Sequence, residues 1–298
     1  MKHERGAIAL LITVMFVIVI TVAIGFGLKQ VNKASALVAQ ENFMYQSQVI
    51  IEDVMTILKS SQEIQLVVDS NTSDALFLLV SQAGFIPFES NGLEIVLKIR
   101  SAREKFNPAQ LDENRTVKLK QFMNYYRINS EYVDILADCI GGIKEDNSYN
   151  SRIFDEKPYL FRDYIASPKH LEEINDFYTK EYSDNALAEI NFDNLFYYSS
   201  DTNVSIDLNF ATTEVWEMML TTSREKAELL SAGMGSYTAV EDLDLNDEEL
   251  INLSMYKYSF FEPILFVELD LMQNGASSRV SFEYDIKKKK GSNFVYEI

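Results

Sequence analysis

The acidic stretch at residues 241–250 comes nearest, in residue type and spacing, to a metal site. Three oxygen-bearing side chains occupy alternate positions, as the first ligands of a calcium-binding loop do: Asp242, Asp244 and Asn246. The pattern then fails, because Asp247 replaces the turn glycine and Leu253 replaces the bidentate glutamate of such a loop. Asn246 as a helix N-cap, with Glu249 as its capping-box partner and acidic residues that favour the helix dipole, explains the same stretch. We therefore expect a capped helix here.

Motifs for catalysis are missing from the sequence. It has no Gly-x-Ser-x-Gly elbow, no glycine-rich phosphate loop and no His-Glu-x-x-His. One cysteine, Cys139, and two histidines, His3 and His170, leave little for disulfide, zinc or triad chemistry. His170 falls in a predicted helix and is expected to face solvent. The chain is expected not to be an enzyme. The alternative, an anchored hydrolase, would require acids with perturbed pKa values gathered in a cleft.

Residues 206–243 are similar to helix-hairpin-helix and SAM-like units. The residues that match that pattern in order are Asn209, Ala211, Glu214, Val215, Ala227, Tyr237, Thr238, Asp242 and Leu243, while Phe210 and Trp216 depart from it. In DNA-binding versions a glycine hairpin aims backbone amides at a phosphate. Here the equivalent turn is Thr221-Thr222-Ser223, which has no glycine. We interpret the unit as a protein-binding or purely structural module.

The charge balance of the chain also argues against DNA binding. The chain has 27 Lys and Arg against 45 Asp and Glu, a net charge of −18. Without residues 1–6 the remainder has 25 against 44, a net charge of −19. A chain this acidic repels phosphate backbones, so nucleic acid is not expected as a partner. The one basic run, Lys287–Lys290, is interpreted as a solvated hairpin end or a guard on a sheet edge.

The N-terminus predicts a membrane segment. From Ala7 to Leu28 no residue is charged, and 22 residues span about 33 Å as a helix, enough for a bilayer core. Lys2 and Arg5 precede this span, which predicts a single pass with the large body exported. Cleavage of a signal peptide at Ala34-Ser35-Ala36 is the competing interpretation.

The predicted helix continues to about Ser60, because no Gly or Pro interrupts it after Leu28. It carries a narrow apolar stripe: Val31, Ala34, Val38, Tyr45 and Val49. Such a stripe requires a partner, which is either the protein's own globular part or a neighbouring subunit.

Downstream, the pattern predicts α+β elements. A helix is expected at 74–84, with Thr72 or Ser73 as N-cap and Gly84 as its end, followed by a strand at 93–102. Helices are then expected at 115–126, 130–140, 168–180, 213–221 and 224–232, and strands at 262–271, 279–286 and 293–298. Asn274-Gly275 is a hairpin signal.

The order of these elements predicts an α+β fold, in which a long N-terminal transmembrane helix precedes a small antiparallel sheet that is interrupted by an inserted, mainly α-helical domain, SAM-like by the pattern at 206–243. The predicted domains are a charged head at 1–6, the transmembrane and extended helix at 7–60, the first part of a β domain at 61–110, the helical insertion at 111–250 and closing strands at 251–298.

These features together resemble the K-type minor pseudopilin family of the type II secretion system. Gly6 before Ala7 resembles a prepilin-peptidase site, with Ala7 as the first mature residue. Leu11 then stands at position five, where most pilins have Glu, and lack of that Glu marks the K-type family. Residues 103–111 and 135–142 resemble two further family segments, although Cys139 and Gly141 depart from the second. Residues 61–92 and 144–165 match no family segment.

The resemblance implies a pilin-like fold, with the long N-terminal transmembrane helix packed on the small antiparallel sheet, and a prepilin leader at residues 1–6. It implies a structural subunit that caps the pseudopilus tip, together with I- and J-type minor pseudopilins, and initiates assembly in protein export. It implies processing by prepilin peptidase and a bacterial inner-membrane location with a periplasmic C-terminal domain. It also implies that the helical domain can bind calcium, although no residue of this sequence can be assigned as a ligand. The alternative is a membrane-anchored exported binding protein of the DNA-uptake type, based on the helix-hairpin-helix likeness. Whether the machine is a secretion system or a related pilus is left open.

Overall fold

The computed structural model describes residues 45–90, 92–273 and 276–297, and it divides the chain into one unit up to Ser60 and a second from Ser61 onward. In the first unit, residues 45–60 are helical, and this helix ends at Ser60 as predicted. The predicted leader, the apolar span 7–28 and the start of the stripe lie outside the described residues. Among the residues that are described, no helix is both long and apolar enough to cross a membrane.

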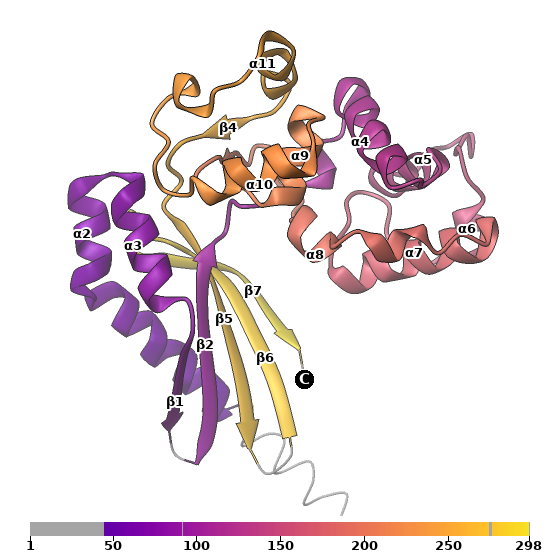
Figure 1. Ribbon diagram of the computed structural model, residues 1–298. Coiled ribbons are helices and arrows are strands. Elements are labelled where there is room, and N and C mark those ends of the chain that lie inside the picture. The colour runs from indigo at the N-terminus through magenta and orange to yellow at the C-terminus, as the bar shows by residue number, and fades with distance from the viewer. Residues whose placement is uncertain (1–44, 91, 274–275, 298) are drawn as a thin grey trace, which may run out of the picture. The chain divides into compact units, whose positions relative to one another are not determined.

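The second unit contains a five-stranded antiparallel sheet in the order β1-β2-β5-β6-β7 (Figure 1). Its strands are β1 (Ile86–Ser90), β2 (Leu93–Ser101), β5 (Ile264–Gln273), β6 (Ala276–Asp285) and β7 (Lys290–Glu297). The four strands predicted from the sequence are confirmed. Strand β1 was not predicted, because it contains Pro87 and has no pattern of buried residues. Proline is tolerated here because β1 is an edge strand, where its missing N–H removes no hydrogen bond between strands. The exposed lysines Lys287–Lys290 form the end of the β6–β7 hairpin, as predicted.

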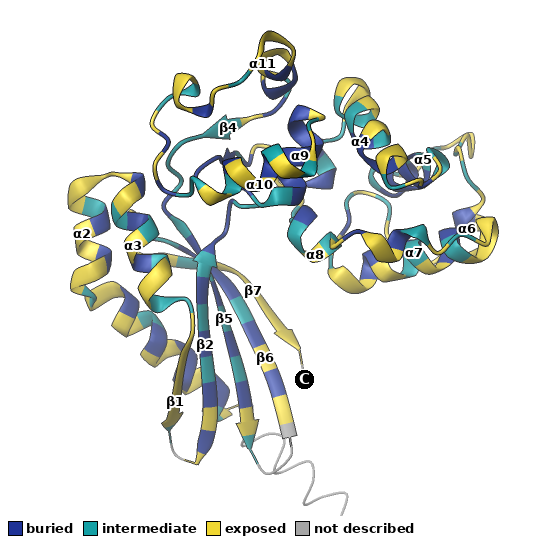
Figure 2. Ribbon diagram, viewed as in Figure 1, coloured by how far each residue is buried: buried dark blue, intermediate teal, exposed yellow. Residues whose placement is uncertain are grey.

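Side chains alternate across the sheet. On one face, buried residues lie opposite each other on neighbouring strands, as in the row Leu97, Leu269 and Val280. On the other face, Lys98 contacts Glu268 and Asp270, at 2.8 and 2.6 Å. Figure 2 shows the resulting alternation of buried with more exposed positions along β2 and β5. The sheet therefore has one apolar and one charged face.

Two helices precede the sheet in this unit, α2 (Gln62–Ser70) and α3 (Ser73–Ala83). They pack against each other, and α3 packs against β2. Helix α3 was predicted and ends before Gly84, with Thr72 at its N-cap. Helix α2 was not predicted; Ser61 caps it by accepting a hydrogen bond from the backbone N–H of Ile64 at 3.2 Å.

Between β2 and β5 the chain forms a helical lobe, which we define as residues 106–256 because they share one hydrophobic core. Its α-helices are α4 (Glu113–Tyr125), α5 (Glu131–Ile140), α6 (Ile153–Glu156), α7 (Pro168–Tyr182), α8 (Phe192–Leu195), α9 (Thr213–Leu220), α10 (Arg224–Ala232) and α11 (Asp247–Leu253). The five longer helices predicted from periodicity are confirmed. Short 3-10 turns lie at Pro108–Gln110, Ala186–Glu189 and Val240–Leu243, and β3 (Ile206–Asp207) pairs in parallel with β4 (Tyr258–Ser259).

The core of the lobe is rich in aromatic side chains. Trp216 on α9 is fully buried, and Tyr132 on α5 packs edge to face on Tyr178 of α7 with ring centroids 5.2 Å apart. His170 corrects a prediction: it is buried, not solvent-facing, and its Nδ1 accepts a hydrogen bond from the backbone N–H of Ala166 at 3.1 Å. Burial lowers the pKa of this imidazole.

Candidate functional site: the junction of sheet and lobe

The residues predicted to direct processing and assembly are Gly6, Ala7 and Leu11. All three lie outside the described residues, so their roles stay predictions. The remaining predicted site residues, Asn209, Ala211, Glu214 and Val215, lie in the lobe, and of these Asn209 contacts α3 and the segment that leads into β5.

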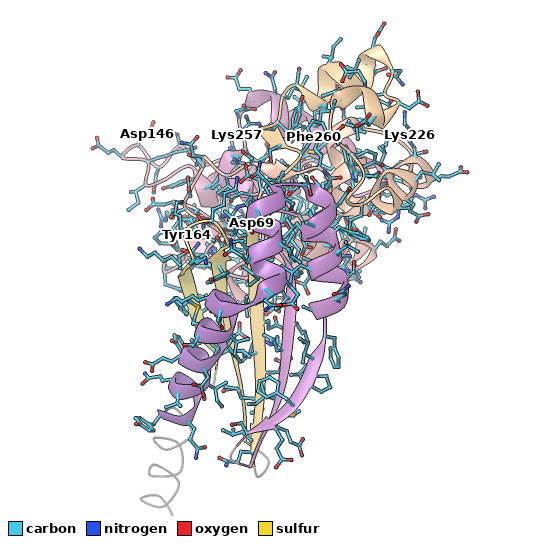
Figure 3. The ribbon with its side chains drawn as sticks, turned by 90° about the vertical axis from the view of Figure 1, so that its left-hand side faces the viewer. Asp69, Asp146, Tyr164, Lys226, Lys257 and Phe260 are labelled. Carbon is cyan, nitrogen blue, oxygen red and sulfur yellow. The ribbon has the colours of Figure 1, made fainter. Side chains whose placement is uncertain are left out.

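Asn209 is a buried hydrogen-bond hub. Its Nδ2 donates to the carbonyl oxygens of Phe260 at 2.7 Å and Tyr237 at 2.8 Å and lies 3.0 Å from Ser73 Oγ. Its Oδ1 accepts from the backbone N–H of Tyr237 at 2.8 Å. One amide therefore ties the start of α3, the segment after α10 and the segment that leads into β5; Phe260 is labelled in Figure 3 above the ends of α2 and α3.

Asp207 lies beside this hub and is fully buried. Its carboxylate accepts hydrogen bonds from the backbone N–H groups of Asn209 at 3.0 Å and Glu262 at 2.8 Å. Its own N–H donates to the carbonyl oxygen of Arg103 at 2.8 Å. Burial raises the pKa of Asp207 to about 7, although the two backbone donors oppose that rise. Asp207 thus contacts both connections between sheet and lobe: its carboxylate binds the segment before β5, and its backbone N–H binds the turn after β2.

Arg103 makes the second contact of the junction. Its guanidinium forms a bidentate pair with Glu283 of β6, with Nη1–Oε1 at 3.1 Å and Nη2–Oε2 at 2.8 Å. Tyr197, which follows α8, donates its hydroxyl hydrogen bond to the same carboxylate, and its ring lies 5.2 Å from the guanidinium carbon. Burial alone would lower the pKa of Arg103, but Glu283 raises it. The register of β6 with β7 shifts beside Glu283.

The segment that resembles a family motif, residues 103–111, begins the lobe. Asn107 donates from Nδ2 to the carbonyl oxygens of Ser199 at 3.0 Å and Asp201 at 2.9 Å, and Gln110 Nε2 donates to those of Thr202 and Val204. The two amides therefore hold the 199–204 segment in place.

The other predicted residues of the SAM-like pattern have separate surroundings. Ala211 and Val215 are core residues. Glu214 is buried, with its Oε1 3.3 Å from Arg224 Nη2. Arg224 also pairs with Glu217 at 3.5 Å, and Tyr126, the C-cap of α4, donates to the carboxylate of Glu217 at 2.9 Å. Burial raises the pKa of Glu217. These contacts fasten α9 to α10 and α4.

The turn between α9 and α10 is covered by a carboxylate. Thr222 Oγ1 donates to Glu249 Oε1 at 3.0 Å, and Lys226 Nζ approaches Glu249 Oε2 at 2.5 Å. Burial opposes ionisation of Glu249, but Lys226 and the backbone N–H of Asn246 hold its pKa below the ordinary range. At the place where a DNA-binding hairpin receives a phosphate, this turn thus holds an ionised acid.

The acidic stretch is used for capping, as predicted. Asn246 Oδ1 accepts from the backbone N–H of Glu249 at 2.9 Å, and Glu249 Oε2 accepts from that of Asn246 at 3.0 Å. Asp242 accepts hydrogen bonds from Thr238 and from the backbone of Ala239, at 2.7 to 3.0 Å. Within the ranges described above, no group of three or more His, Cys, Asp or Glu side chains is arranged to hold a metal ion. Calcium binding therefore stays an unassigned prediction of the resemblance.

Asp138 is a buried acid whose role the sequence did not reveal. It accepts four hydrogen bonds, from the backbone N–H and side chain of both Asn150 and Ser151, at 2.8 to 3.1 Å. Its carboxylate holds the loop after α5 against the helix. Cys139, next to it, is also buried, and burial raises the pKa of its thiol to about 12.

The Arg103–Glu283 pair was also missed by sequence reasoning. Arg103 stands in a segment quoted for the resemblance, but nothing local marks its partner, because the two residues lie 180 positions apart. The sequence offered no usable signal, because β6 also contains Arg279 and Asp285, and Glu283 does not stand out among them.

The architecture is a mixed α+β one, in which an antiparallel sheet is interrupted in the chain by a helical lobe. A scan against protein-family models found no match, and a search of curated proteins by sequence found none either. Among solved structures, the chain is similar to a chain in the crystal structure of the GspK-GspI-GspJ complex from the enterotoxigenic Escherichia coli type 2 secretion system. The TM-score is 0.56 and the sequence identity 12%, and the match covers 87% of this chain and 99% of that chain. The likeness establishes a shared fold.

Proposed function

We propose that the protein is a K-type minor pseudopilin, a structural and non-enzymatic subunit at the tip of a type II secretion pseudopilus. The observation that carries the proposal is the shared fold: nearly the whole of a chain from a pseudopilin complex is matched, lobe included. In this role it would assemble with I- and J-type minor pseudopilins and initiate the pseudopilus.

The N-terminal sequence supports the tip position. A carboxylate within the membrane is costly unless it meets a positive group, such as the new N-terminal amine of a neighbouring subunit. Leu11 offers no such carboxylate, and a subunit at the tip has no later subunit to pair with. The bulk of the helical lobe would also obstruct the addition of a subunit beyond it. In this proposal the body lies in the periplasm and is anchored by one pass in the inner membrane, as the charge pattern around residues 7–28 predicts.

Contacts within the helical lobe argue against the alternative, a DNA-uptake binding protein. Glu249 lies at the hairpin that would have to receive a phosphate, and Lys226 beside it is already paired. The net charge of −18 opposes a polyanion at longer range.

The first experiment is mass spectrometry of the mature N-terminus, after expression with and without prepilin peptidase. The proposal predicts that residues 1–6 are lost only when the peptidase is present, so that the mature chain begins at Ala7. A mature chain that begins at Met1 in both strains, or after Ala36, would contradict it.

The second experiment is co-purification of the processed chain with I- and J-type minor pseudopilins in detergent. The proposal predicts a complex that contains all three. Steep, salt-dependent affinity for duplex DNA with no such complex would favour the DNA-uptake alternative instead.

A further inference from the structure

The loops at residues 141–165 expose a group of large apolar side chains. Ile143 is 79% exposed, Tyr159 71% and Phe161 45%. We define these three as the loop patch. The backbone N–H of Gly142 donates to the carbonyl oxygen of Arg162 at 2.8 Å, which brings the two loops that carry the patch side by side. Exposed aromatic and aliphatic side chains that gather in this way are typical of a protein interaction site.

The loop patch stands on an ordered base. Arg162 lies over the ring of Phe154, 3.9 Å from its centroid, and donates to the hydroxyl of Tyr149 at 2.9 Å. That hydroxyl accepts from the backbone N–H of Lys144 at 2.9 Å, and Asp138 holds the intervening loop. The apolar side chains are therefore presented by backbone that is fixed before any partner binds, which lowers the entropic cost of binding.

The side chain of Tyr159 is also held in position before a partner binds. Its hydroxyl donates to Glu173 of α7 at 2.9 Å, although its ring is exposed. A positioned, exposed tyrosine is the kind of side chain that anchors protein interfaces.

The charges around the loop patch identify its partner. The basic side chains nearby are engaged: Lys144 with Ser148, Lys157 with Glu173 and Arg162 with the rings beneath it. Among residues 141–165 the exposed acids outnumber the exposed bases: Glu145, Asp146, Asp155, Glu156 and Asp163 stand against Arg152, which is paired with Glu181. Beyond this rim, residues 111–250 contain 12 basic and 29 acidic residues, a net charge of −17. A second copy of this chain and an anionic lipid surface are therefore repelled, and a cationic partner is attracted.

We propose that the loop patch binds a protein segment whose apolar or aromatic side chains are flanked by lysine or arginine. The apolar residues of the segment would cover Tyr159, Phe161 and Ile143, and its basic residues would meet the acidic rim. The inference does not depend on the proposed place at a pseudopilus tip.

The test uses the full chain in a non-ionic detergent and three fluorescein-labelled peptides, read by anisotropy. The first has a Leu-Phe-Leu core with lysines on both sides, the second has the same core with glutamates, and the third has lysines around a serine core. We expect saturable binding of the first peptide only, weakened by salt.

Variants locate the contact. Phe161→Ala and Ile143→Ser should each weaken binding of the first peptide about tenfold or more, and Glu145→Lys should weaken it and reduce its dependence on salt. Leu229→Ser, which alters a side chain 68% exposed on α10, is the matched control and should leave binding within about twofold. Equal loss in the control, equal binding of the glutamate peptide, or binding of the serine-core peptide as tight as that of the first would each overturn the proposal.

Discussion

Arg103 and Glu283 join the turn after β2 to strand β6 through two parallel hydrogen bonds, of 3.1 and 2.8 Å, with both side chains about nine-tenths buried. The pair stands where the sheet meets the helical lobe, and Tyr197 adds a third contact from the lobe side. The junction is thus made by charge and hydrogen bonds as well as by apolar packing. Removing one partner would leave the other charge buried without compensation.

Arg103→Met alone should therefore lower the free energy of unfolding by about 3–5 kcal/mol. The double variant Arg103→Met with Glu283→Leu should recover most of that loss, since no charge is then stranded. Urea denaturation of the purified chain measures both. A double variant as unstable as the single one would show that packing at the junction, rather than the stranded carboxylate, dominates.

Asp207 should make stability depend on pH. Burial raises its pKa to about 7, above its ordinary value of 3.8. Its protonated form is favoured in the folded state, so this contribution is complete below about pH 4, is lost as pH rises through 7, and is constant above. The free energy of unfolding should fall over that window by a few kcal/mol at most. In Asp207→Asn the fall should be smaller, and an unchanged fall in the variant would assign the dependence to other groups.

Asn209→Ala should cost about 2–4 kcal/mol of stability, because it strands the backbone N–H and the carbonyl oxygen of Tyr237 in the interior. Asn203→Ala is the matched control, because Asn203 is an exposed asparagine whose side chain accepts a hydrogen bond from Lys257 at the surface; its cost should stay below about 0.5 kcal/mol. Thermal unfolding of the two variants measures both losses of stability. Similar costs for the two variants would mean that Asn209 is no hub.

Asp138→Ala should release the loop at residues 141–152, because four hydrogen bonds end on its carboxylate. Hydrogen exchange at Asn150 and Ser151 should then accelerate, and proteases should cut this loop first. Asp146→Asn, at an exposed acid of the same loop, should leave exchange unchanged. If Asp138→Ala left the exchange rates as they were, the loop would be held by other contacts.

The elements that the sequence predicted are those with local signals. Helix α7 begins at Ser167-Pro168, where Ser167 accepts a hydrogen bond from the N–H of His170, and α11 begins at a capping box. Strands β2, β5 and β6 alternate apolar with polar residues over much of their length, and the β5–β6 pairing reaches Gln273 and Ala276, on either side of the Asn274-Gly275 signal. These features depend on neighbours in the chain, so a single sequence contains them.

The features that the sequence did not predict depend on residues far away in the chain. Strand β1 contains a proline and exposed residues, and only its pairing with β2 makes it a strand. His170 looked polar enough for solvent, but its burial follows from packing in the core of the lobe. Asn209 and Glu214 were selected by resemblance, and their geometry shows the first as a hub and the second in an ion pair. The contacts of Arg103 with Glu283, and of Asp138 with its loop, required the folded chain.

The pairing of β2 with β5 also has a kinetic consequence. Lys98 and Glu268 face each other in the sheet although 170 positions separate them in the chain, and the helical lobe fills that interval. Closing so long a loop from a disordered chain is slow. A lobe that folds first, on its own core, brings its two ends together and removes most of that cost. The pairing of β2 with β5 would then form only after the whole lobe has been synthesised and has folded.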